Sequence, residues 1–97
     1  MKATLLFHEK RIVENVKTGE LAVVELKIWQ LAIHYPEGRK FSLFLVASGT
    51  VLIGIDNHKP KGPHLHLGKE EVPYVYVDDN VLLADFWDMT RKAGFKP

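Results

Sequence analysis

Apolar and polar residues alternate along most of the first half of the chain, which is the pattern of strands with one face on a core. Residues 2–8 and 11–16 alternate only in part and predict a strand broken by a bulge around residues 9–10. Residues 21–33 alternate more regularly and predict a long antiparallel strand. Gly19 precedes this strand where a hairpin requires positive φ, so the two strands are expected to pair.

Two further segments, residues 40–48 and 50–56, carry apolar side chains on both faces. Gly49 separates them, so they are predicted to form the central hairpin of the sheet. Within the first segment, Phe41 is expected to point to one face and Phe44 to the other. A sheet that is apolar on both faces needs cover on both, and an uncovered face is expected to bind a partner or a second copy of the chain.

A helix is predicted over residues 81–94. Residues 78–80 offer side chains that cap a helix N-terminus, and Gly94 is placed to end the helix. Its apolar face is expected to consist of Leu82, Leu83, Phe86, Met89 and Ala93. Together with a further short strand around Tyr74 and Tyr76, these elements predict an α+β fold: a mostly antiparallel sheet of about five strands with one C-terminal helix packed on it, in a single domain over residues 1–97.

The composition narrows the class of protein. The chain has 97 residues, of which 46% are apolar and 26% charged, as in ordinary globular domains. A net charge of +1 means that any nucleic-acid-binding surface has to be a local basic patch. The absence of cysteine excludes disulfides, thiolate ligands and cysteine nucleophiles. No apolar run is long enough to span a membrane and no signal-peptide core is present, so a cytoplasmic protein is expected.

The chemically informative side chains gather in residues 56–69, DNHKPKGPHLHLGK. This segment holds three of the five histidines, and its prolines and glycines restrict the backbone. If residues 64–66 are extended, both imidazoles lie on one face and Leu65 on the other. Leu65 and Leu67 are then expected to anchor the segment to the core.

One interpretation of this segment is a metal site. His64 and His66, with His58 or Asp56 as a third ligand, resemble the ligand set of catalytic zinc. The lysines of the segment would repel a divalent ion, and few carboxylates are available to orient the histidines. Neither a metal nor another cofactor is therefore predicted.

A second interpretation is phosphodiester cleavage without a metal. One imidazole of His64 and His66 would remove the 2′-hydroxyl proton of RNA, and the other would protonate the leaving 5′-oxygen. Lys61 would stabilise the negative charge of the transition state, and Asp56 or Glu71 would orient a histidine. The residues expected to contact RNA phosphates or bases are Arg39, Lys40, Asn57, His58, Lys59, Lys69 and Tyr74.

A third interpretation is a polar loop that binds a partner protein or nucleic acid without turnover. Surface histidines are common, and nothing in the spacing alone fixes the mutual orientation of these imidazoles. Composition and spacing leave the three interpretations open.

The succession LIGIDN, KGPHLH, GKEEVPY and LLADFW resembles the TumE family, small toxins of bacterial and archaeal toxin–antitoxin pairs. The resemblance extends from the opening KATLLFHEK through ELKIWQL to the terminal helix. The family's motif residues fall on Asp56, Asn57, Lys61, Gly62, His64, His66, Glu71 and Tyr74. It implies the toxin of a type II module, neutralised by direct binding of an antitoxin that usually carries a helix-turn-helix DNA-binding domain.

The chain departs from the family pattern at two positions. Pro63 stands where an aspartate often precedes the first histidine, and Leu65 stands where the family often has a polar residue. Asp56 or Glu71 would then have to replace that aspartate as the orienting carboxylate. With the resemblance included, the sequence predicts a toxin that acts as a small metal-independent ribonuclease, with a non-enzymatic binding module and a metal-dependent nuclease as alternatives.

Overall fold

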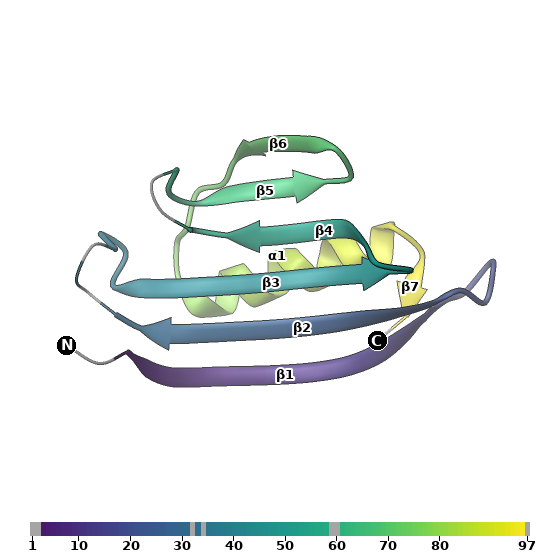
Figure 1. Cartoon of the computed structure of the whole chain (residues 1–97), viewed down its shortest axis with the longest axis horizontal. Helices are drawn as coiled ribbons and strands as arrows, with labels where there is room; N and C mark the ends of the chain where they lie inside the picture. The colour runs from purple at the N-terminus through teal and green to yellow at the C-terminus, as the bar shows by residue number, and fades with distance from the viewer. Residues whose placement is uncertain (1–2, 32, 34, 59–60, 97) are drawn as a thin grey trace.

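The computed structural model describes residues 3–31, 33, 35–58 and 61–96. In this part of the chain, seven antiparallel strands form one sheet with the order β6-β5-β4-β3-β2-β1-β7, and one helix packs on it (Figure 1). The elements are β1 (Thr4–Asn15), β2 (Leu21–Gln30), β3 (Arg39–Ala47), β4 (Thr50–Asp56), β5 (His64–Leu67), β6 (Glu70–Pro73), α1 (Asp79–Lys92) and β7 (Phe95–Lys96). The predicted α+β class is confirmed.

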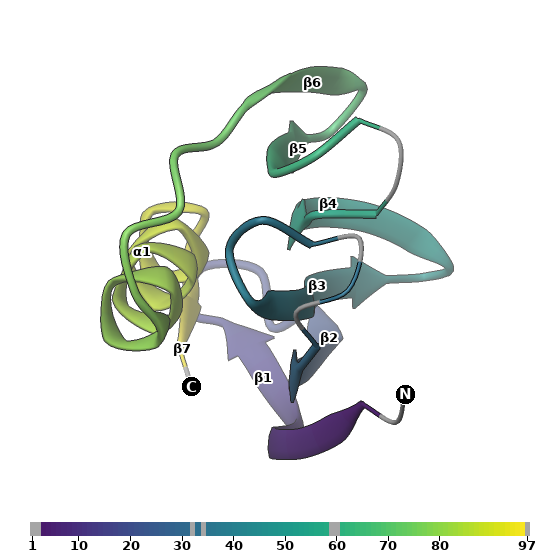
Figure 2. The ribbon, with the colours of Figure 1, turned by 90° about the vertical axis from the view of Figure 1, so that its left-hand side faces the viewer.

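The sheet is a meander in which β1 to β5 each pair with the next strand along the chain, so that β6 forms one edge. The chain then crosses one face of the sheet as α1, and β7 returns to pair with β1 through Asn15 and Phe95 (Figure 2). All of α1 therefore lies on one side of the sheet. The opposite side, which we call the open face, is not covered by any other described element.

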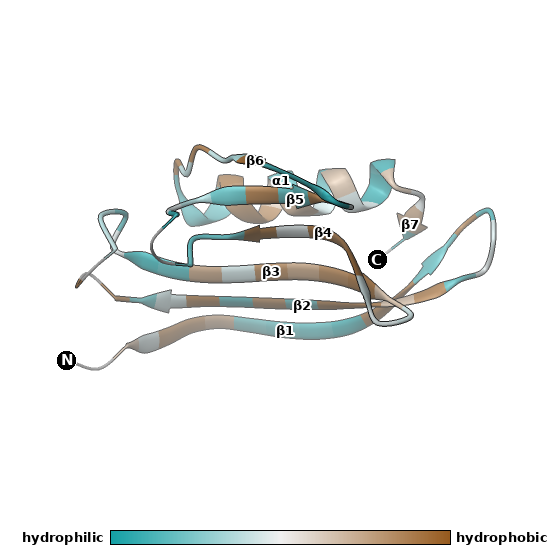
Figure 3. Ribbon diagram, turned by 45° about the horizontal axis from the view of Figure 1, so that its top comes forward, coloured by the Kyte–Doolittle hydropathy of each residue, from teal (hydrophilic) through white to brown (hydrophobic). Residues whose placement is uncertain are grey.

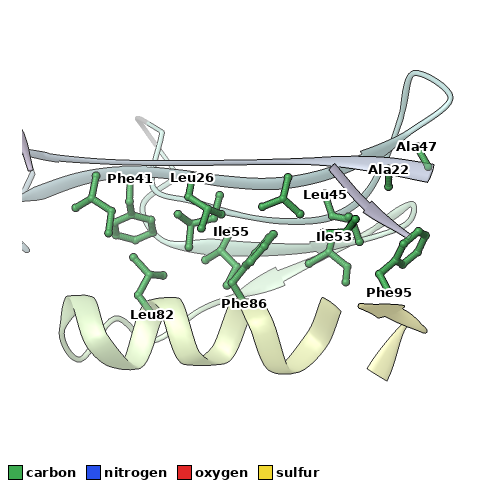
Figure 4. Packing of buried hydrophobic residues seen from close by; sticks show 14 residues of the cluster. Ala22, Leu26, Phe41, Leu45, Ala47, Ile53, Ile55, Leu82, Phe86 and Phe95 are labelled. Carbon is green, nitrogen blue, oxygen red and sulfur yellow. The ribbon is translucent and has the colours of Figure 1, made fainter. Parts of the chain in front are cut away.

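The core lies between α1 and the sheet. Leu82 and Phe86 point from the helix toward the strands (Figure 4) and are fully buried. They meet alternate residues of the central strands, among them Leu26, Phe41 and Ile55. Figure 3 shows mostly hydrophobic residues along β3 and β4 and a hydrophilic stretch in the middle of β1. The apolar residues at alternate positions of these strands thus form one buried face, as the sequence predicted.

The helix begins at Asp79, two residues before the predicted start, and ends at Lys92, so Ala93 caps it and is exposed rather than part of the apolar face. The Asp78 carboxylate caps it by accepting a hydrogen bond of 2.8 Å from the Val81 backbone N–H. Gly94 follows the helix with φ +99°, a conformation that other residues rarely adopt. Thr90 is also fully buried, and its hydroxyl donates a hydrogen bond to the Phe86 carbonyl, which offsets the cost of burying it. No helix in the described part of the chain is long and apolar enough to cross a membrane.

Several details of the sheet differ from the prediction. The sheet has seven strands rather than about five. The histidine segment contributes to the hairpin of β5 and β6, and residues 95–96 form the additional short strand β7. The irregularity of β1 lies between Leu5 and Phe7, not around residues 9–10. Residues 74–78 form no strand, so the predicted strand around Tyr74 and Tyr76 is wrong. Instead, both tyrosine hydroxyls bind carboxylates of α1.

The open face carries the side chains that point away from α1. Phe44 lies on this face and is half-buried, whereas Phe41 on the other face is buried, as predicted. One cross-strand row on the open face runs from Lys10 through Glu25, Phe44 and Gly54 to His66, according to the strand register. The histidine pair therefore lies on the side of the sheet opposite to the helix.

Candidate functional site

The hairpin of β4 and β5 brings the main candidate residues together. Asp56 at the end of β4 lies directly opposite His64 at the start of β5. His66 lies two residues farther along β5, opposite Glu71 of β6. Since successive side chains of a strand alternate between faces, His64 and His66 share the open face, as predicted. Leu65 points to the other side and packs against the core, whereas Leu67 is 41% exposed and does not anchor the segment.

The Asp56 carboxylate lies between the two imidazoles. Its Oδ1 atom is 2.7 Å from His64 Nε2, and its Oδ2 atom is 3.7 Å from His66 Nε2. The two rings are 4.6 Å apart and meet edge to face. Asp56 Oδ1 is buried and makes no hydrogen bond to any described residue, so its approach to His64 is a close polar contact without hydrogen-bond alignment.

The backbone holds the His64 ring in one orientation. Nδ1 donates a hydrogen bond of 2.7 Å to the Gly62 carbonyl, which requires that Nδ1 carry a proton. Gly62 adopts φ +76°, so a residue with a side chain would be strained at this position. Nε2 is thereby left as the nitrogen that faces Asp56, and the ring as a whole is buried.

The His66 ring is held more loosely. Its two nitrogens are each 3.7 Å from a carboxylate oxygen, Nε2 from Asp56 and Nδ1 from Glu71. The side chain is 25% exposed, against 10% for His64. His66 is thus the histidine of the pair that solvent or a ligand reaches more easily.

Lys61 and Glu71 complete the cluster. Lys61 Nζ donates a hydrogen bond of 2.8 Å to Glu71 Oε1, and this bond lowers the pKa of the Glu71 carboxyl against the opposing effect of burial. A hollow of about 160 Å³ lies beside both side chains and is bordered by His64 and Pro73. The structure thus brings together all five residues that were predicted to be catalytic.

Three of the residues predicted to bind RNA have structural contacts instead. Asn57 is 1% exposed; it accepts a hydrogen bond from the Phe41 N–H and donates one to the Arg39 carbonyl. In this structure the Asn57 side chain is therefore occupied by the backbone and is not exposed for contact with RNA. The Arg39 side chain binds Asp79 at the start of α1, away from the open face, and the Tyr74 hydroxyl donates to Asp85.

The other predicted RNA contacts are placed differently. Lys40 is on the open face. It precedes Ser42 by two residues, and Ser42 lies opposite Asp56. The Lys40 ammonium group lies over the Trp29 ring. His58 and Lys69 are exposed, the latter in the turn between β5 and β6. Lys59 is outside the described residues. For these four residues, RNA contact stays a prediction.

Sequence reasoning missed Gly54, which lies opposite His66 in the sheet. A β-carbon at this position would fall 2.4 Å from the Phe44 ring, so only glycine admits the ring there. Phe44 in turn lies beside the His66 imidazole, with ring centroids 6.1 Å apart. An isolated glycine inside an apolar strand was the available signal, since it often marks a close approach.

A second polar cluster lies farther along the open face. His8 Nε2 is 3.1 Å from Glu25 Oε2, and Lys27 Nζ is 3.8 Å from the same oxygen. The His8 hydrogen bond lowers the pKa of Glu25. A groove of about 270 Å³ runs here and reaches Ser42 and Phe44, the neighbours of the histidine site.

The fold and the polar cluster describe a small α+β protein whose candidate site is built on an uncovered sheet face. The family model described as "Toxin TumE" matches residues 2–93, and the chain therefore belongs to the TumE toxin family. Searches of curated proteins and of solved structures returned no match. The family places the chain among the toxins of toxin–antitoxin systems, and its partner is an antitoxin.

Proposed function

We propose that this toxin is a small ribonuclease whose working site consists of Asp56, His64, His66, Lys61 and Glu71. The observation that carries the proposal is the position of the Asp56 carboxylate, within 2.7 Å and 3.7 Å of the two imidazole Nε2 atoms. A carboxylate so placed orients two groups that exchange protons near neutral pH. The site lies on the open face, where a long ligand such as RNA has access.

His66 is the better candidate for general base. It is the more exposed histidine, and carboxylates 3.7 Å away orient its ring without aligned hydrogen bonds. His66 takes the 2′-hydroxyl proton while the 2′-oxygen attacks phosphorus, and His64 Nε2 supplies the proton that the leaving 5′-oxygen receives. The products are a 2′,3′-cyclic phosphate and a 5′-hydroxyl, so no water, metal or cofactor enters this step.

Lys61 supplies positive charge beside the histidines. Its side chain is 63% exposed, and its ammonium group lies at the hollow bordered by His64. A phosphate in this hollow would share the ammonium group with Glu71, and the interaction would strengthen as charge grows in the transition state. We propose Lys40, on the open face, and Lys69, in the turn after β5, as further phosphate contacts.

The open face also supports direct neutralisation by a protein antitoxin, as in a type II module. Val23 and Val46 border the groove next to the site, and Val23 is 37% exposed. A partner that buried these apolar side chains would cover the neighbouring histidines at the same time. We propose an antitoxin with a helix-turn-helix domain as that partner.

Induced expression in bacteria tests the ribonuclease proposal. The wild type should arrest growth and degrade RNA, and the purified protein should cleave RNA in the presence of EDTA. His64→Ala and His66→Ala should each abolish both effects. His8→Ala is the matched control, because it removes an imidazole from the same face outside the site. Full toxicity in both site variants would refute the assignment, and tight RNA binding without cleavage would favour the non-enzymatic alternative.

One observation favours a second candidate function, a metal-dependent nuclease. Asp56 Oδ1 is buried without a hydrogen bond, next to two histidine nitrogens. A divalent ion held there would supply an activated water as the nucleophile. Loss of RNA cleavage in EDTA and its return with added metal would favour this candidate over the first.

A further inference from the structure

We propose that Asp56, His64 and His66 form a binding site for one first-row transition-metal ion, with Zn²⁺ as the ion that fits best. Each residue offers one ligand atom, and the three atoms lie within 4.8 Å of one another. Ligands that surround Zn²⁺ tetrahedrally at about 2.0–2.2 Å are themselves separated by about 3.3–3.6 Å. The two histidine Nε2 atoms contact different Asp56 oxygens, His64 with Oδ1 at 2.7 Å and His66 with Oδ2 at 3.7 Å, so side-chain movements of about 1 Å would bring three ligand atoms to that spacing.

The surroundings of both histidines suit metal ligation. A histidine that binds a metal through one nitrogen usually donates its other N–H to a carbonyl or carboxylate. His64 meets this condition, because Nδ1 donates to the Gly62 carbonyl and Nε2 faces Asp56. His66 has Glu71 Oε2 at 3.7 Å from Nδ1 and directs Nε2 toward the same Asp56.

The carboxylate supplies an independent argument. Asp56 Oδ1 is buried and accepts no hydrogen bond from any described residue. A buried carboxylate oxygen without an aligned hydrogen bond is costly, and a cation would compensate it most strongly. The side chain is 16% exposed, so an ion from solvent can reach the other oxygen.

The sequence indicated two obstacles to a metal: repulsion by the lysines and a shortage of carboxylates around the histidines. Both are smaller in the described part of the structure, which does not include Lys59. Lys61 is hydrogen-bonded to Glu71, which balances its charge, and Lys69 is exposed in the turn after β5. Glu71 is also the carboxylate that faces His66. The site therefore contains the supporting groups that the sequence did not reveal.

The ligand set also selects the kind of ion. Two imidazole nitrogens and one carboxylate suit Zn²⁺ and its first-row neighbours, whereas Mg²⁺ and Ca²⁺ prefer oxygen ligands alone. Three protein ligands leave at least one position open for water or a phosphate oxygen, as in catalytic zinc sites. The proposal concerns ion binding and goes beyond the ribonuclease activity proposed above. A bound ion would occupy the Nε2 atoms that face Asp56, so the metal-independent reaction belongs to the ion-free protein.

Calorimetry on the full chain, purified without a histidine tag and freed of metal, tests the proposal with ZnCl₂ as the probe. The wild type should bind one Zn²⁺ per chain with a Kd of about 10 μM or tighter. The His64→Ala/His66→Ala double variant should lose this binding, and Asp56→Asn should weaken it at least about tenfold. His8→Ala should bind like the wild type. Absence of binding, or binding that survives in the double variant, would overturn the proposal.

Two further measurements keep the result interpretable. Circular dichroism shows whether each variant is folded, and His66→Gln replaces any variant that is not. Zn²⁺ should also raise the Tm of the wild type but not of the double variant, because only the wild-type folded state binds the ion. An equal rise in both proteins would refute the site.

RNA cleavage separates this inference from the proposed function. Cleavage in EDTA by a protein that binds no Zn²⁺ would refute the metal site and leave the metal-independent ribonuclease standing. Zn²⁺ binding at the three residues by a protein that cleaves no RNA would support the metal site and refute the ribonuclease. Cleavage that requires the ion would support the site and replace the metal-independent mechanism.

Discussion

The ring of Phe44 lies against the α-carbon of Gly54 on the neighbouring strand. A β-carbon at position 54 would fall 2.4 Å from Phe44 Cε1 and 3.3 Å from His66 Cδ2. The three residues form one cross-strand row of β3, β4 and β5. The missing side chain of Gly54 therefore lets Phe44 form a wall beside the His66 imidazole.

Gly54→Ala should destabilise the protein by about 1–3 kcal/mol, because the new methyl group at a buried position forces the half-buried Phe44 ring to move. The displaced ring should also shift His66 and lower RNA cleavage. Urea unfolding measures the first effect. Adding Phe44→Leu should recover part of the lost stability, since the smaller side chain relieves the clash. Strictly additive losses in the double variant would contradict this explanation.

The parts of the fold that local pattern determines were predictable. β3 and β4 follow from their apolar segments and the intervening glycine, and α1 follows from its capping residues and apolar spacing. β5, β6 and β7 have only two to four residues each. Strands this short form because a neighbouring strand offers hydrogen bonds. The periodicity of their own few residues does not show which strand that neighbour is.

The candidate site was also predictable only in part. Period-two alternation placed His64 and His66 on one face, which the structure confirms. The position of Asp56 between them depends on the β4–β5 register. The burial of Asn57 depends on β3, which is distant in sequence. A polar residue next to a site therefore looked like a binding residue, although its side chain supports the backbone.

Asn57→Ala should lower the free energy of unfolding by about 1–3 kcal/mol, because it leaves the buried Phe41 N–H and Arg39 C=O without their partner. Asn57→Asp should also destabilise, since a carboxylate cannot donate to the Arg39 carbonyl. Urea unfolding checks both variants. Asn80→Ala, at an exposed position of α1, is the control and should change stability little. A similar loss in the control would argue against the structural role of Asn57.

Lys61→Gln separates charge at the site from fold stability. If Lys61 stabilises the transition state, cleavage should fall about 10²-fold, while stability should change by less than about 1 kcal/mol because the ion pair with Glu71 is exposed. Cleavage assays and urea unfolding provide the two readouts. Lys92→Gln is a matched control, since Lys92 is an exposed lysine in an ion pair with Asp88 on α1. Equal cleavage by both variants would remove Lys61 from the proposed mechanism.

Two tyrosines couple the segment after β6 to the helix. The Tyr76 hydroxyl donates a hydrogen bond of 2.6 Å to Asp79, and the Tyr74 hydroxyl donates one of 2.6 Å to Asp85. Burial, and then these hydrogen bonds to carboxylates, raise the pKa of Tyr76 to about 12 and raise that of Tyr74 as well. The folded state thus favours the neutral phenols.

This coupling predicts a loss of stability at alkaline pH. Since an unfolded tyrosine titrates near about 10, the contribution of the two phenols is complete below that pH and is lost as the pH rises through the higher folded-state pKa values. Tyr74→Phe/Tyr76→Phe should be less stable than the wild type at neutral pH, by about 1 kcal/mol per hydrogen bond. It should lose less stability between about pH 10 and 12. Thermal unfolding across this range, with phenolate absorbance recorded in parallel, measures the difference, and parallel stability curves for the two proteins would show that these tyrosines are not responsible.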